Sequence, residues 1–112
     1  TDVRWFALHD QTGMGLMALG EPFLSTGALH FDMRNLDFNH NEKTNKHGGS
    51  MQNEKLIWWN IDYKQMGVGG DNSWGAKTLS PYTLPSQNYA YSFTLRLIKP
   101  GEQLIAKSKE RY

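Results

Sequence analysis

Cysteine is absent from the 112-residue chain, which excludes disulfide bonds, thiolate zinc sites and cysteine nucleophiles. No apolar run approaches the roughly 18 residues of a membrane-spanning helix, and no basic segment leads into an apolar one as in a signal peptide. Neither sign of charge is in excess, since 12 Lys and Arg against 11 Asp and Glu leave a net charge of +1. This balance argues against a nucleic-acid-binding protein. We therefore expect no nucleic acid and no membrane among its partners.

Aromatic residues and glycine stand out among what is present. The chain has 14 aromatic residues, four of them Trp, and 11 Gly, whereas Val occurs only twice. Its length suits a single domain with one core. Because the sequence begins with Thr1 rather than Met, we expect a processed chain or a piece of a longer protein.

Apolar and polar residues alternate with a period of two in several segments, which is typical of half-buried β-strands. This alternation occurs in 29–33, in 55–63 and in 89–98, whereas segment 3–9 is apolar on both faces and suits a central strand. The apolar side of the last of these segments carries Tyr89, Tyr91, Phe93, Leu95 and Leu97.

Turn-forming residues separate these segments. Residues 10–13 predict a hairpin turn that leads into a strand at 14–19, and residues 20–22 predict a break in the chain. Residues 39–54 are polar and predict a long surface loop. Three further segments are a short piece bounded by prolines at 78–84 and two weakly helical pieces at 33–38 and 102–111.

Short strands joined by turns predict an all-β fold, an antiparallel β-sandwich, over residues 1–98. Residues 99–112 change sharply in composition and carry several charges. We interpret them as a charged tail, either a frayed helix or a linker.

Two segments match functional motifs, but a structural interpretation is favoured for each. Residues 13–18 match the G-x-G-x-x-A dinucleotide fingerprint, but Gly20 and Pro22 would stop the helix that must follow, so a hairpin is favoured. His40 and His47 flank Glu42 in a polar loop, yet their spacing is not that of a usual metal site, so a solvated loop is favoured.

No catalytic group is predicted in this chain. The 11 acidic residues are scattered, and no two of them suggest the paired carboxylates of a glycosidase. A Ser-His-Asp triad is defined by geometry and cannot be identified from sequence.

The most informative segment is 58–75, where a strand runs into a glycine-rich loop. Glycines allow tight turns there, and short polar side chains can hydrogen-bond the loop amides. Six residues are predicted to shape the loop: Gly67, Gly69, Gly70, Asp71, Asn72 and Ser73. Trp74 follows them, and its flat indole with one N–H donor suits stacking on a sugar ring. From composition alone, an inward-packed Trp74 that anchors the loop stays an equal alternative.

This segment resembles the C-terminal domain, or small-chain region, of glycoside hydrolase family 2 β-galactosidases. The family signature there is an Asn-Ile-Asp strand followed by a Met-Gly-hydrophobic-Gly-Gly-Asp-acid/amide-Ser-Trp loop. Residues 60–62 and 66–74 match it residue by residue. The resemblance covers about 3–98, and the tail after Pro100 has no counterpart. Supporting matches are Arg4 with Trp5, residues 13–15 and residues 89–91.

The resemblance implies the C-terminal portion of a β-supersandwich related to galactose-mutarotase-like folds. It implies a retaining hydrolase of terminal β-D-galactosides such as lactose, whose two catalytic glutamates lie in a TIM barrel outside this chain. The isolated chain is therefore expected to be inactive. The family's Mg²⁺ and Na⁺ sites lie in other domains, so no cofactor is expected here. Trp74 matches the tryptophan that stacks on the aglycone sugar, which is the glucose of lactose.

Two other functions stay open at this point. The chain could be a free-standing carbohydrate-binding module that uses the same loop, or a structural domain whose aromatics serve only the core. If it is a truncated sandwich, it exposes an apolar sheet face, and we expect it to self-associate as a homo-oligomer. The expected partners are a β-galactoside, on its aglycone side, and other domains of a parent chain. The compartment, cytoplasm or periplasm, stays open.

Overall fold

The computed structural model describes residues 1–32, 53–69, 72 and 74–110. Its elements are four strands, β1 (Val3–His9), β2 (Gly15–Leu29), β3 (Trp58–Asp62) and β4 (Ser92–Ile98), one 3₁₀ turn η3 (Ser80–Tyr82) and one short helix α1 (Leu104–Lys107). The strand pairs whose registers are known are antiparallel, and the described residues contain almost no helix, so the all-β prediction is confirmed. Within the described ranges, no helix is long and apolar enough to cross a membrane.

β1 and β2 form the predicted hairpin, and its turn is built around one carboxylate. Oδ1 of Asp10 accepts hydrogen bonds from the amide and hydroxyl of Thr12 and from the amide of Met14. The Thr12 hydroxyl is the main reason that the pKa of Asp10 lies below its ordinary value. Gly13 supplies the positive φ, 87°, that the turn requires. A strand follows this turn, so the G-x-G-x-x-A match opens no helix and is a hairpin, as favoured from the sequence.

The predicted break at residues 20–22 is wrong, because β2 continues through them as one strand of 15 residues. The register with β1 shifts there instead: Trp5 lies opposite Leu19, but Val3 lies opposite Leu24. An advance of two residues along β1 therefore corresponds to five residues along β2, so β2 carries extra residues that form a β-bulge. The cis peptide bond between Glu21 and Pro22 lies inside this bulge.

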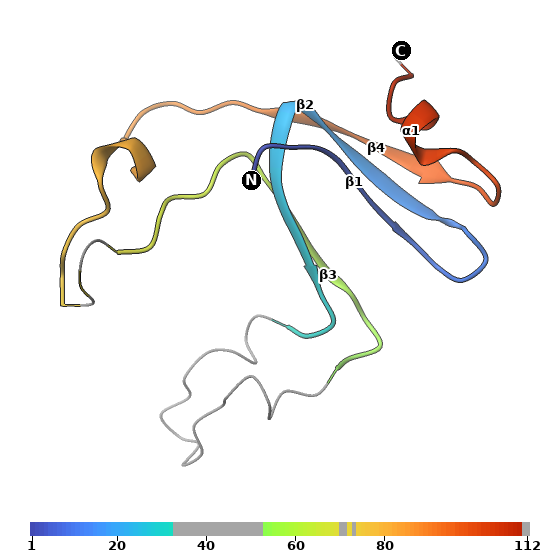
Figure 1. The fold of residues 1–112 in the computed structure, drawn as a ribbon, viewed down its shortest axis with the longest axis horizontal. Helices are drawn as coiled ribbons and strands as arrows, with labels where there is room; N and C mark the ends of the chain where they lie inside the picture. The colour runs from blue at the N-terminus through green and yellow to red at the C-terminus, as the bar shows by residue number, and fades with distance from the viewer. Residues whose placement is uncertain (33–52, 70–71, 73, 111–112) are drawn as a thin grey trace. The chain divides into compact units, whose positions relative to one another are not determined.

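β2 is the central strand of the described sheet. Its first half pairs with β1 on one side and with β4 on the other, and the strand order continues from β2 to β3 (Figure 1). The prediction that segment 3–9 is the central strand is therefore wrong, since β1 lies at the edge. The chain divides into two compact units, residues 1–26 with 61–112 and residues 27–60. Within the second unit, the amide of Glu54 donates to the carbonyl of His30.

One face of the β1–β2–β4 sheet is covered by the C-terminal segment. Directly opposite residues point to the same side of a sheet, so Ala7, Met17 and Arg96 share this covered face. The Arg96 guanidinium donates to the carbonyls of Lys107 and Glu110, both at 2.5 Å, and so holds α1 against the sheet. Met17 and Ile98 are fully or almost fully buried here.

The other face of the same sheet is apolar, and its larger side chains are exposed or half-buried. The register places Phe6, Leu8, Leu16, Ala18, Phe93, Leu95 and Leu97 on this apolar face. Leu95 is 52% exposed and Leu97 is 66% exposed, whereas Arg96 between them is only 9% exposed. The sequence pattern predicts the reverse for β4. The prediction is wrong because α1 covers the polar side, while no described segment covers the apolar one.

Several predicted features lie outside the described residues. These are the helical segment 33–38, the metal candidates His40, Glu42 and His47, and the loop residues Gly70, Asp71 and Ser73. The predicted loop 39–54 is described only at its last two residues. The weakly helical segment 102–111 contains α1.

Candidate functional site

Trp74 projects into solvent from the loop that follows β3. Its side chain is 92% exposed, and its amide donates to Oδ1 of Asn72 at 3.0 Å. Such a bond between an Asn side chain and the backbone two residues on fixes a local turn. Gly69 and Gly75, on either side, have φ values of +73° and +111°, which side-chain-bearing residues rarely adopt. The indole is thus presented on a turn with its ring face open.

The base of this loop is a cluster of three residues that no sequence motif connects. The amide of Gly67 donates to the carbonyl of Tyr82 at 2.9 Å, and its carbonyl accepts from the hydroxyl of Thr78, also at 2.9 Å. A Cβ on Gly67 would meet Cγ2 of Thr78 at 2.9 Å and Cβ of Tyr82 at 3.1 Å. We call Gly67, Thr78 and Tyr82 the loop base.

η3 presents the Tyr82 carbonyl to this base. Pro81 stands in the first turn of η3, where its fixed φ fits and its missing N–H costs nothing. The hydroxyl of Thr83 donates to the carbonyls of Thr78 and Leu79, both at 3.2 Å. The only sequence signal of this arrangement was the pair of prolines that bounds segment 78–84.

Aromatic rings line the chain on both sides of the loop. Tyr63, just after β3, stacks on Tyr91 at a centroid distance of 5.5 Å and meets Tyr89 edge-on at 6.2 Å. Tyr91 in turn stacks on Phe93 of β4 at 6.0 Å, and its hydroxyl donates to the carbonyl of Ile61. These contacts tie the segment before the loop to the segment after it.

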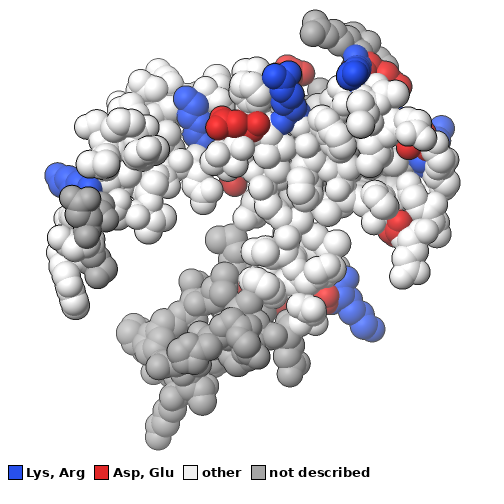
Figure 2. Space-filling model, in the orientation of Figure 1, with Lys and Arg blue, Asp and Glu red and all other residues white. Residues whose placement is uncertain are grey.

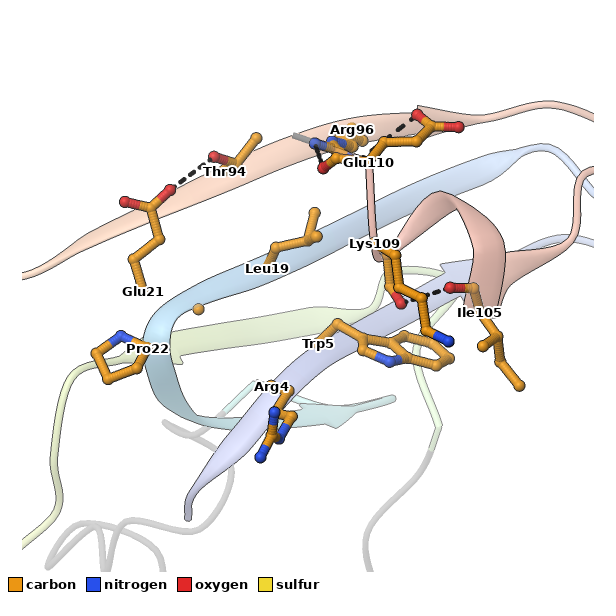
Figure 3. Close-up of a pocket in the computed structure, with 12 residues that line it drawn as sticks. Arg4, Trp5, Leu19, Glu21, Pro22, Thr94, Arg96, Ile105, Lys109 and Glu110 are labelled. Atoms are coloured by element: carbon orange, nitrogen blue, oxygen red, sulfur yellow. Dashed lines mark hydrogen bonds and ion pairs between the residues drawn. The ribbon is translucent and has the colours of Figure 1, made fainter. Parts of the chain in front are cut away.

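A cavity of about 760 Å³ lies between the covered face and the C-terminal segment. Figure 3 shows Trp5 and Leu19 on the sheet side and Ile105 and Lys109 on the tail side. The carboxylate of Glu21 at its edge accepts hydrogen bonds from Ser92 and Thr94. The cavity contains none of the residues predicted to contact sugar.

Among the described residues, Trp74 offers an exposed aromatic surface. Within them, no group of three or more His, Asp or Glu side chains could hold a metal ion. On the face drawn in Figure 2, charged side chains of both signs are scattered among uncharged ones, and neither sign gathers into a patch. What the arrangement can do is present an indole to an apolar face of a ligand.

Comparison with known proteins supplies the family. A family model described as "Beta galactosidase small chain" matches residues 1–95. The chain belongs to the β-galactosidase small-chain family. This confirms the resemblance found in the sequence.

Several curated relatives of this chain are named β-galactosidase. The protein of Priestia megaterium is 36% identical over 97 residues, which is 86% of this chain but 9% of the relative. The protein of Pseudoalteromonas haloplanktis is 44% identical over 50 residues, which is 45% of the chain and 5% of the relative. The protein of Klebsiella pneumoniae strain 342 is 33% identical over 73 residues, which is 65% of the chain and 7% of the relative. The chain thus spans less than a tenth of the length of these relatives.

Proposed function

We propose that this chain acts as part of a β-galactosidase and supplies Trp74 to the aglycone side of the active site. The single observation that carries the proposal is the 92% exposed indole of Trp74 on a loop whose base is fixed by hydrogen bonds. An inward-packed anchor would have a buried ring, so the exposure favours the stacking role over that alternative. The apolar ring face suits the C–H face of a sugar.

The chemistry of bond cleavage belongs to other parts of the proposed parent enzyme. A retaining glycosidase needs two carboxylates about 5 Å apart, and no such pair was found in this sequence. The isolated chain is therefore proposed to be inactive, with the metal ions of the parent enzyme bound in other domains. Its contribution is to hold the leaving sugar in place.

The test is Trp74→Ala in the intact enzyme. Loss of an aromatic contact of about 0.5–1.5 kcal/mol raises the KM for lactose by roughly two- to tenfold, with kcat little changed because the contact is made in ground and transition states alike. Lys77→Ala, an exposed position just after the loop, is the matched control. An unchanged KM for lactose in Trp74→Ala contradicts the proposal.

A further inference from the structure

The backbone of Gly67 is held through both of its polar groups. Its N–H reaches the Tyr82 carbonyl, and its carbonyl receives the Thr78 hydroxyl. A third restraint is steric, since Thr78 and Tyr82 approach so closely that they would collide with any Cβ at this position. Gly67 is therefore fixed in position by side-chain and backbone groups from later in the chain.

The hydrogen bond from Thr78 to Gly67 joins two points that flank Trp74. Gly67 precedes Trp74 in the sequence and Thr78 follows it, so this bond closes the loop that carries the indole. Closing a flexible loop removes conformational freedom from its free state. A ring presented by a closed loop loses less freedom when it stacks on a ligand, and this favours binding.

Thr78 is itself held from the far side. Its carbonyl accepts the Thr83 hydroxyl, and the amide of Thr83 donates to the carbonyl of Ser80 at the start of η3. The Thr78 side chain, which is part-buried, is thus presented from a supported turn. Among the described residues of the loop, the Thr78 hydroxyl is bonded to the carbonyl of Gly67, and it therefore acts on the loop through that bond.

We propose that Thr78 is a positioning residue for Trp74 and thereby a determinant of the preference for a sugar aglycone. The inference rests on the proposed function of Trp74 as the aglycone-stacking residue. In this role Thr78 acts through the loop and not by contact with the substrate. Its hydrogen bond to Gly67 fixes the two ends of the loop relative to each other, and the position of the Trp74 indole depends on them.

The experiment compares two substitutions of Thr78 in the intact enzyme with two substrates. Thr78→Val keeps the shape of the side chain and removes the hydroxyl, whereas Thr78→Ser keeps the hydroxyl. Lactose has a sugar aglycone, and methyl β-D-galactoside has one too small to stack on an indole. Loss of one net hydrogen bond predicts a rise in the KM for lactose of about two- to tenfold in Thr78→Val, with kcat and the KM for the methyl galactoside unchanged. Thr78→Ser is expected to restore the wild-type KM.

A second measurement follows the loop base directly. Hydrogen–deuterium exchange of the peptide that contains Gly67 is expected to accelerate in Thr78→Val and to stay at the wild-type rate in Thr78→Ser. Equal loss of activity toward both substrates would indicate general damage and overturn the positioning role. An unchanged KM for lactose in Thr78→Val, alongside a raised KM in Trp74→Ala, would also overturn it while leaving the proposed function intact. If Trp74→Ala itself leaves KM unchanged, the proposed function fails first.

Discussion

At the scale of single residues, two glycines of β2 differ sharply in what surrounds them. A Cβ on Gly15 would lie 2.0 Å from the carbonyl oxygen of Leu8 and 2.6 Å from Cα of His9, whereas a Cβ on Gly27 would meet nothing within 4 Å. The first contacts are with backbone, which cannot move without disturbing the β1–β2 pairing. Glycine at position 15 is therefore required by close approach of the hairpin strands.

We expect Gly15→Ala to destabilise the chain by about 2 kcal/mol, the range of overpacking in well-packed sites. Gly27→Ala, on the same strand, is expected to change stability by no more than about 0.5 kcal/mol. Urea denaturation of both variants measures the difference. Equal midpoints would show that the hairpin accommodates the added methyl group.

At the scale of elements, the short helix α1 depends on the sheet beneath it. A helix of four residues has almost no stability of its own, so its position comes from tertiary contacts. Arg96 donates one hydrogen bond to the carbonyl of Lys107, the last residue of α1, and one to the carbonyl of Glu110 beyond it, and Lys107 pairs with Glu102 at 2.8 Å. The segment is thus held at both ends.

Replacing Arg96 is expected to release this helix. Arg96→Met keeps much of the apolar stem but loses both hydrogen bonds, at a cost of about 2 kcal/mol. Arg96→Lys has an intermediate effect, because one ammonium cannot reproduce the planar fork of a guanidinium. Trypsin cleavage after Lys107 and Lys109 is expected to be faster in Arg96→Met. The control Gln103→Ala, which removes an exposed side chain that caps nothing, should be cleaved at the wild-type rate.

The same segment should weaken in acid. The hydrogen bond from Lys107 lowers the pKa of Glu102, and the amide of Lys99 adds to this effect. Because the folded pKa lies below the unfolded one, the ionised carboxylate stabilises the fold above about pH 4.3, and this contribution is lost as the pH falls through the folded pKa. We expect Glu102→Gln to lower the urea midpoint at pH 7 but not at about pH 3. If the urea midpoint of Glu102→Gln stayed below that of the wild type at about pH 3, the stabilising role of the ionised Glu102 carboxylate would be contradicted.

At the scale of the whole molecule, the main feature is the exposed apolar face of the β1–β2–β4 sheet. Phe93, Leu95 and Leu97 line it, with Leu16 beside them, and none of the residues assigned to it is charged. Contiguous apolar surface of this kind marks a site of association. It agrees with a chain that spans less than a tenth of its relatives.

We expect the 112-residue chain to self-associate through this apolar face. The double substitution Leu95→Lys, Leu97→Glu should shift it toward monomer, because burying two charges in an apolar contact is unfavourable. Light scattering over a range of protein concentrations measures the effect. Val68→Lys, at a fully exposed position away from this face, is the control. A wild-type chain that stays monomeric at all concentrations would rule out association through the sheet.

The sequence by itself determined the family, the strand-forming segments and the tryptophan to test. The apolar segment 3–9 located β1, period-two alternation located the strand cores of β3 and β4, and the spacing of residues 66–74 identified the loop, because these signals are local. Prediction from the sequence failed where the structure depends on contacts between distant residues. β2 continues through Gly20 and Pro22 because its pairing with β1 accommodates a bulge there. Tertiary structure alone decided that Arg96 is buried and Leu97 exposed, because burial depends on which segment covers a face. It also brought Thr78 and Tyr82 to Gly67, since residues eleven or more positions apart meet only after the chain has folded back.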